Sequence, residues 1–223
     1  LKRYAHLGTG NYHRKTSLLY TDYSLLTADS ILCADVHKVF QQITGMGKKI
    51  HPKLIIHAPF SMRKSIVKMI KHEKQTALDG KPARIIAKLN ALTDPAVIKE
   101  LYEASSAGVQ IELIVRGVCC LKPKIPRVSE NIRVISVVGR FLEHSRVYYF
   151  LNANHPVYCS SADWMERNFD DRVEIMVPIH NPTVHRQILD QIMMANVKDT
   201  KQSWILKSNG EYRRVADEPI FCS

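Results

Sequence analysis

The sequence predicts an α/β protein in which a sheet is flanked by helices. After residue 54, short apolar runs alternate with segments of helical periodicity. The two expected helices, at 61–78 and 95–107, carry apolar residues three and four positions apart, which gives each helix one buried face. The order strand, helix, strand, helix, strand favours parallel pairing through right-handed crossovers. The expected strands lie at 54–58, 84–89 and 109–115.

The remaining elements are predicted from the spacing of apolar residues and from the turn-forming residues between them. Residues 14–27 alternate in a strand, loop, strand manner, and Ala28-Asp29 leads into a helix near 35–43 that the turn at 44–47 ends. The basic, polar segment that follows indicates a domain boundary around 45–53. Beyond a loop at 118–130, we expect strands at 132–138, 146–151, 157–159 and 172–177, a helix at 181–196, and a hairpin that joins 204–206 to 212–215 through Asn209-Gly210.

The amino-acid composition favours some classes of binding partner over others. Lys and Arg number 32 against 21 Asp and Glu, for a net charge of +11, so the surface should attract a polyanion. Basic residues are not interleaved with aromatic residues as they are on a platform that binds single-stranded nucleic acid, which argues against nucleic acid as a partner.

The cysteines and the hydropathy bear on the location of the protein. The odd set of five cysteines lacks a CxxC pair and favours a reducing cytoplasm. The sequence contains no membrane-span signal, and its first residue, Leu1, suggests a piece of a longer chain.

A glycine-containing turn near the start could bind an anion. Gly8 and Gly10 allow close backbone approach and can direct N–H groups toward a ligand, while Thr9 and Asn11 add short polar side chains. The alternative is an ordinary turn, and on the residues alone the two interpretations weigh about equally.

A histidine and two arginines fit phosphate chemistry. If a strand runs through His144 and Arg146, their side chains share a face and place a proton donor beside a permanent cation. Arg116 closes the apolar run ELIV, where its guanidinium would emerge at the ligand-binding edge of the sheet. The alternatives are a surface His-Arg pair bound to Glu143 and an arginine that only reaches water.

Two further groups leave structural and functional interpretations open. The carboxylates at 170, 171 and 174 could hold Arg167 or His144 in place, or could form an internal ion-pair network. The other histidines lack the spacing of metal ligands.

Several long stretches carry a family resemblance: YAHLGTGNYHRKT, LYTDYSLLTAD, LIVRGVCCL, SENIRVISVVGRFLEHSRVYYF and SSADWMERN. With them the chain resembles the carboxyl-terminal part of bacterial polyphosphate kinases of the histidine-phosphate type, which are similar to phospholipase D enzymes. The resemblance implies a phospholipase-D-like mixed sheet flanked by helices. Residues 1–50 would then complete a first catalytic domain, and residues 54–223 would form a second.

The resemblance also implies an activity. These enzymes reversibly transfer the terminal phosphate of ATP to inorganic polyphosphate through a phosphohistidine. By the resemblance, the nucleophilic histidine and the arginines associated with Mg²⁺ precede this chain, so the chain alone should be inactive and should hold no metal. The implied setting is a homodimer or tetramer in the cytoplasm, and peripheral contact with the inner membrane is left open.

Site residues are carried over from the family by position. Tyr20, Arg116, His144 and Arg146 are expected to bind ATP, and His144 is expected to act as an acid. His6, which is expected in the catalytic set together with His144, matches a second family histidine whose role is not settled. Candidates for the phosphate path are Asn11, Arg140, Ser161 and Arg167. Two other classes stay open: a phospholipase-D-like phosphodiesterase or nuclease, although no complete H-x-K-x4-D element is present, and a non-catalytic polyanion-binding module.

Overall fold

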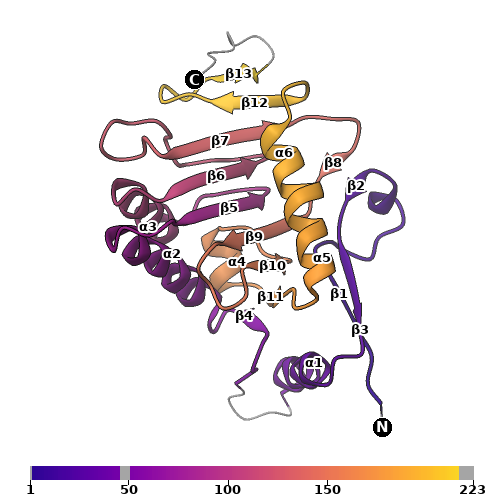
Figure 1. Ribbon diagram of the computed structural model, residues 1–223. Coiled ribbons are helices and arrows are strands. Elements are labelled where there is room, and N and C mark those ends of the chain that lie inside the picture. The colour runs from indigo at the N-terminus through magenta and orange to yellow at the C-terminus, as the bar shows by residue number, and fades with distance from the viewer. Residues whose placement is uncertain (1, 46–50, 216–223) are drawn as a thin grey trace.

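A mixed nine-stranded sheet forms the centre of the computed structural model, which describes residues 2–45 and 51–215 (Figure 1). Its strand order is β13-β12-β7-β6-β5-β9-β10-β11-β4, with β5, β6 and β7 parallel and the other neighbours antiparallel. The predicted α/β class with a mixed sheet between helices is confirmed. The strands are β4 (Ile56–Ala58), β5 (Arg84–Leu89), β6 (Gln110–Val115), β7 (Ile132–Val137), β9 (Arg146–Phe150), β10 (Val157–Ser160), β11 (Glu174–Pro178), β12 (Ser203–Leu206) and β13 (Tyr212–Arg214).

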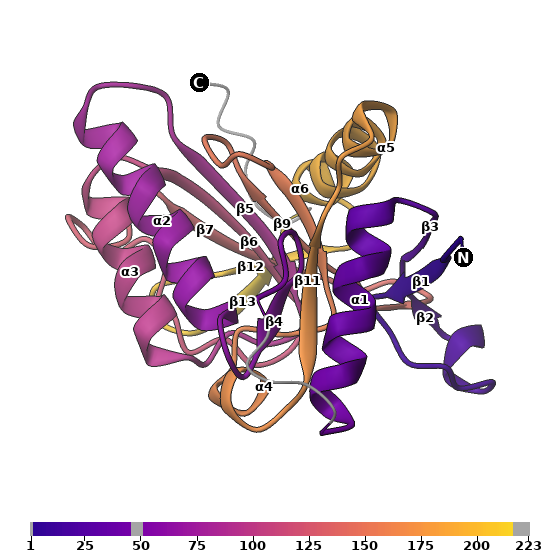
Figure 2. The same cartoon turned by 90° about the horizontal axis from the view of Figure 1, so that it is seen from below.

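Helices cover both faces of this sheet (Figure 2). On one face lie α2 (Met62–Leu78) and α3 (Pro95–Ser106), whose predicted apolar stripes are buried: Ile66, Ile70 and Leu101 are fully inaccessible. On the other face, one continuous helical segment consists of α5 (Pro182–Arg186), a π-helical stretch at Gln187–Met193 and α6 (Met194–Lys198). None of the described helices combines the length and the apolar character needed to cross a bilayer.

The expected parallel pairing of the first two strands after residue 54 is wrong. β4 lies at the far edge of the sheet, where Glu174–Met176 of β11 pairs with it in antiparallel fashion. Three antiparallel strands, β9, β10 and β11, separate β4 from β5. These strands come from later in the chain, so local pattern could not reveal the insertion. The parallel prediction holds for β5 and β6, and β7, for which no direction was predicted, is a further parallel neighbour of β6.

The first region of the chain, residues 2–45, forms a small unit beside the large sheet, and residues 51–215 are called the second region. β1 (Ala5–Gly8) and β3 (Ser24–Thr27) form an antiparallel pair, and a short 3-10 helix (Thr16–Leu18) lies between them. β2 (Tyr20–Thr21) pairs in parallel with β8 (Leu142–Glu143), which links the first region to the second. α1 (Ser30–Ile43) begins earlier than expected because the Asp29 carboxylate accepts hydrogen bonds from the N–H groups of Ile31 and Leu32, at 3.0 and 2.8 Å.

Several boundaries differ modestly from the sequence expectation. The short helix α4 (Glu166–Asp170) and the strands β1 and β8 were not predicted. The predicted strand at 172–177 is β11, and the hairpin across Asn209-Gly210 is present as β12 and β13. The expected helix at 181–196 changes to π-helical hydrogen bonding in its middle. The expected turn at 44–47 and boundary at 45–53 fall partly on residues 46–50, outside the described residues.

Candidate functional site

Four segments of the second region end at the same edge of the sheet. Asn90 and Arg116 directly follow the parallel strands β5 and β6, so they emerge at the carboxyl end of both strands. β9 runs antiparallel to β5, which brings its first residues to the same edge, and Ser160 of β10 pairs with Arg146 there. His144 precedes β9 and Asp163 follows β10. The topology therefore collects polar side chains from distant parts of the sequence at one place.

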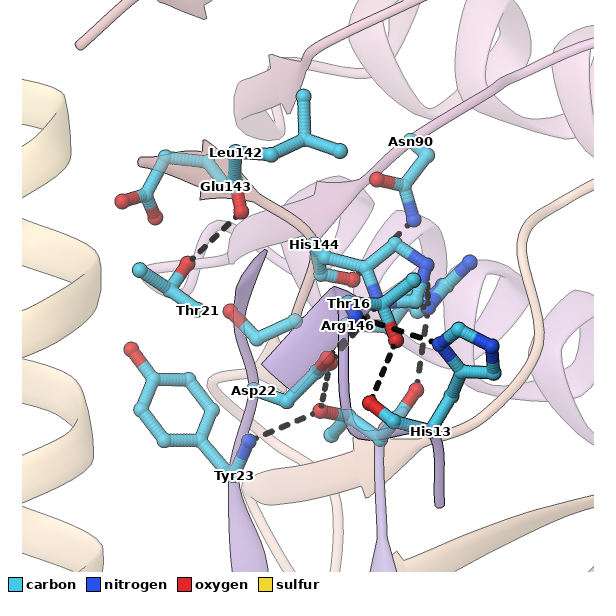
Figure 3. A network of polar contacts seen from close by, with 12 residues as sticks. His13, Thr16, Thr21, Asp22, Tyr23, Asn90, Leu142, Glu143, His144 and Arg146 are labelled. Atoms are coloured by element: carbon cyan, nitrogen blue, oxygen red, sulfur yellow. Dashed lines mark hydrogen bonds and ion pairs between the residues drawn. The ribbon is translucent and has the colours of Figure 1, made fainter. Parts of the chain in front are cut away.

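His144 is held by a carboxylate from the first region (Figure 3). Its Nδ1 lies 2.9 and 3.0 Å from the two carboxylate oxygens of Asp22, 122 residues away in the sequence. Because a carboxylate only accepts hydrogen bonds, this contact places a proton on Nδ1 and leaves Nε2 as the second functional ring nitrogen. The ring of Tyr20 packs against the imidazole with 4.8 Å between ring centroids.

Arg146 lies beside His144 as the sequence predicted, although His144 is just outside the strand. Its Nη1 is 3.2 Å from both imidazole nitrogens. The guanidinium is buried and forms an ion pair with Asp163, with Nη2 2.9 Å from Oδ2. Nη1 also donates to the backbone carbonyl of Thr9 at 3.0 Å. Arg146 thus joins the two regions, and the alternative pairing with Glu143 is wrong because Glu143 binds Lys88.

The glycine-containing turn positions Asp22. The buried Thr9 hydroxyl donates to Asp22 Oδ1 at 2.8 Å and accepts from the N–H of Tyr23 at 2.9 Å. A Cβ atom at position 10 would lie 2.1 Å from Asp22 Oδ2, so only glycine leaves room for this carboxylate. Burial alone would raise the pKa of Asp22, but hydrogen bonds from His144 and Thr9 and the charge of Arg146 outweigh it and hold that pKa below its usual value.

Arg116 connects to the same network through Asn90. The half-buried Arg116 donates from Nε to Asn90 Oδ1 at 2.8 Å. The Asn90 side-chain amide donates to the carbonyl of His144 and to Asp163 Oδ1, each at 3.2 Å. Arg116 is therefore oriented by a side chain at the sheet edge, unlike an arginine that only extends into water.

Two hollows meet at Tyr20. The first has a volume of about 360 Å³ and is lined by Tyr20, Arg116, Arg140, Phe141 and neighbouring residues of both regions. The second, of about 470 Å³, belongs to the first region, and its lining includes His6, Asn11, Tyr20 and Asp22. The guanidinium of the exposed Arg140 lies 5.7 Å from the ring centroid of Phe141. Tyr20 borders both hollows, so a ligand that spans them would pass its ring.

Other predicted residues lie farther from His144 in the network of contacts. His6 is exposed and its Nδ1 contacts the hydroxyl of Tyr12. The hydroxyl of Ser161 donates to Glu174, which also accepts from Asn168 at 2.7 Å. Glu174 therefore belongs to an internal network and holds neither His144 nor Arg167; the latter is exposed on α4.

Sequence reasoning missed Asp22, Lys88 and Asn90 as members of this site. Lys88 and Asn90 are polar residues at alternate positions at the end of an apolar strand, a pattern that would have marked them. Asp22 has no such signal, because its partner lies in a distant segment.

Within residues 2–45 and 51–215, no group of three or more His, Cys, Asp or Glu side chains is arranged to hold a metal ion.

The fold and this cluster define an α/β protein with a histidine and two arginines gathered at one edge of its sheet. The family model described as polyphosphate kinase C-terminal domain 2 matches residues 54–220, and the model described as polyphosphate kinase C-terminal domain 1 matches residues 1–49. The chain belongs to the polyphosphate kinase family.

Individual relatives agree with this assignment. The chain is 54% identical over 217 residues to a polyphosphate kinase of Pseudomonas aeruginosa and 52% identical over 215 residues to one of Paraburkholderia phytofirmans, covering 97% and 96% of this chain. A crystal structure of polyphosphate kinase from Porphyromonas gingivalis matches with a TM-score of 0.90 and 37% identity, over 97% of this chain and 34% of that chain. The chain spans 31% of the length of the two curated relatives.

Proposed function

We propose that this chain supplies part of the catalytic site of a polyphosphate kinase that reversibly transfers the terminal phosphate of ATP to inorganic polyphosphate through a phosphohistidine. The observation that carries the proposal is the convergence of Tyr20, Arg116 and His144 around one hollow and its border. Phosphoryl transfer depends mainly on positioning and on fixed positive charge around the phosphate oxygens. The cluster provides both.

Each side chain has a distinct proposed role. Arg116 binds ATP phosphates with its planar guanidinium, which Asn90 holds in place. Tyr20 offers a ring surface at the junction of the two hollows. His144, in its imidazolium form, donates the Nε2 proton to the departing oxygen, while Asp22 stabilises the positive charge through Nδ1. Arg146 lies beside the imidazole and keeps the Thr9 loop against it.

The remaining family expectations complete the proposal. The division of the chain into residues 1–50 and 54–223 as parts of two phospholipase-D-like domains stays a prediction. So do the phosphate path through Asn11, Arg140, Ser161 and Arg167, the requirement for Mg²⁺, the homodimer or tetramer, and the cytoplasmic location. The position of the Mg²⁺-associated arginines before this chain, which the family resemblance implies, is also a prediction.

Labelled ATP tests the proposal in the complete protein that carries this chain. Wild type should incorporate terminal phosphate into an acid-precipitable polymer. His144→Ala should reduce turnover by roughly 10² to 10⁴, the range for loss of a general acid. His180→Ala, which alters an exposed histidine in the loop between β11 and α5, is the matched control and should keep wild-type turnover. A folded wild type that forms no polymer would disprove the proposal, and cleavage of a phosphodiester without ATP would favour a phosphodiesterase.

A further inference from the structure

Lys88 is a buried cation next to the candidate site. It lies on β5 and its side chain is only 2% exposed, among the largest fully buried side chains of the described residues. Lysine is rarely buried to this extent without partners, because removing its charge from water is costly. Its place in the structure therefore needs a physical explanation.

The two partners of Lys88 are the residues on either side of His144. Its Nζ lies 2.8 Å from Glu143 Oε2 and 2.6 Å from the hydroxyl of Ser145. One ammonium group thus binds both chain neighbours of the imidazole. Residues 143–145, from the last residue of β8 to the residue before β9, are therefore attached to the central strand β5 at two points.

The same segment is tied to the first region. Glu143 pairs with Thr21 in the β2–β8 contact, and the N–H of His144 donates to the carbonyl of Thr21 at 3.2 Å. These contacts place Tyr20 on one side of His144 and Asp22 on the other along β2 and its continuation. Any shift of residues 143–145 would therefore move His144 relative to both residues.

Charges of both signs face Lys88 from the elements around it. Burial lowers the pKa of Lys88, whereas the carboxylates of Glu143 and Asp22 favour its charged form and the guanidinium of Arg146 opposes it. Ser145 also faces the hydroxyl of Tyr23, whose pKa burial raises to about 12, so that this hydroxyl stays protonated at neutral pH. Both direct contacts of the Lys88 ammonium are with protein side chains, and Lys88 is not among the residues that line the two hollows at Tyr20.

We propose that Lys88 is a positioning residue, which fixes the orientation of the His144 imidazole by holding both of its neighbours in the chain. This inference rests on the proposed function for its consequence in catalysis. The inference has a structural part, which concerns only the orientation of the His144 ring and its contact with Asp22.

A spectroscopic experiment on the 223-residue chain tests the structural part. The ¹⁵N shifts of the His144 ring, identified by their loss in His144→Ala, report which nitrogen carries the proton, measured at about pH 9 where histidine is ordinarily neutral. Wild type should be mainly protonated at Nδ1, and Lys88→Met should shift toward a mixture of the two tautomers. Ser145→Ala removes one of the two contacts with little change in volume and should show a smaller shift in the same direction.

Kinetics in the complete protein test the consequence. Lys88→Met should lower kcat by about 10- to 100-fold, as expected for a misplaced catalytic group, with KM for ATP nearly unchanged. Lys88→Arg keeps the charge and should recover part of kcat. Lys74→Met is the matched control, because Lys74 forms a 2.7 Å ion pair with Glu103 on the helical face, and it should leave kcat and the His144 tautomer unchanged.

The outcomes separate this inference from the proposed function. Unchanged His144 tautomers in folded Lys88→Met overturn the inference, as does a loss in kcat that matches only the fraction of unfolded protein. If Lys88→Met does not fold, Ser145→Ala decides: a shifted tautomer with reduced kcat supports the inference, and wild-type values of both overturn it. A complete wild type without kinase activity removes the proposed function, and the tautomer measurement still tests Lys88.

Discussion

The first 45 residues and the rest of the chain bury their apolar side chains very differently. The second region packs a large core on both faces of the sheet, with residues such as Trp164, Leu101 and Phe150 fully buried. The first region shares a small cluster around Leu7, Leu32 and Val39 with neighbouring strands. It leaves many large apolar side chains exposed: Tyr4, Tyr12, Leu18, Leu19, Leu26, Ile31, Phe40 and Ile43.

This difference shows how the candidate site depends on its two parts. The second region can hold Asn90, Arg116 and His144 on a rigid sheet edge, whereas Asp22 comes from a region with little core of its own. The first region contacts the second through this small apolar cluster, through polar contacts of Asp22 and Thr9, and through the short β2–β8 pairing. These contacts between the two regions are called the joint below. The geometry around His144 should therefore depend more on the joint than on the stability of either region alone.

The strongest way to break the joint is to remove the partner of Arg146. Asp163→Ala should lower the free energy of unfolding by about 3–5 kcal/mol, because it leaves a buried guanidinium without its carboxylate. Amide hydrogen exchange should also accelerate in residues 5–27, since Arg146 then loses the anchor that presents it to Thr9. Asp170→Ala, which removes a half-exposed partner of Arg63, should have a much smaller effect. Equal effects of the two substitutions would contradict this account.

A pair of leucine substitutions sharpens the contrast in packing. Leu101→Ala should cost about 2–5 kcal/mol of unfolding free energy, because it creates a cavity in a fully buried site. Leu26→Ala, at a side chain that is 79% exposed, should change it by less than about 0.5 kcal/mol. Urea denaturation of both variants gives the comparison. A large loss for Leu26→Ala would mean that another molecule, such as a second copy of the chain, covers this face in solution.

The Thr9 hydroxyl offers a smaller, local test. Thr9→Val keeps the shape of the side chain but removes the donor to Asp22 and the acceptor for Tyr23. Loss of these two hydrogen bonds, one of them to a charged carboxylate, should cost about 1–3 kcal/mol. Thr44→Val serves as the control, since Thr44 is exposed at the end of α1, and its unfolding curve should overlay that of wild type. If Thr9→Val behaves like the control, the Thr9 contacts do not stabilise the joint.

The sequence predicted the second region well because its elements are locally encoded. Strands β5, β6 and β7 and the helices α2 and α3 carry their own period, and the crossover through α3 explains the parallel order of β5 and β6. The edge position of β4 depends on pairing with β11, more than a hundred residues later, so no local pattern could indicate it.

The site was predicted in part for the same reason. Arg116 could be placed at the sheet edge from the end of one apolar strand, and His144 and Arg146 could be placed together by spacing. Asp22 could not be connected to His144, because their contact depends on how the two regions pack. The partner of Arg146, Asp163, could not be chosen from the sequence either, because the pairing depends on how β9 and the residues after β10 lie side by side.

The smallest expected effect concerns the pH dependence of the Asp22 contact. The pKa of Asp22 is lowered in the folded protein, since hydrogen bonds from His144 and Thr9 overcome the opposing effect of burial. A carboxyl group of this kind stabilises the fold fully above its unfolded pKa of about 3.9, and the contribution disappears as the pH falls through the lower folded value.

Asp22→Asn keeps the shape of the side chain and removes its titration. The difference in unfolding free energy between wild type and Asp22→Asn should therefore decrease steadily from about pH 4 to pH 2, as measured by urea denaturation at closely spaced pH values. Asp29→Asn, which changes a carboxylate that caps α1 away from His144, controls for general acid effects. A difference that grows on acidification would mean that Asp22 is more readily protonated in the folded protein than in the unfolded chain, and that the carboxylate does not hold the imidazole as the structure indicates.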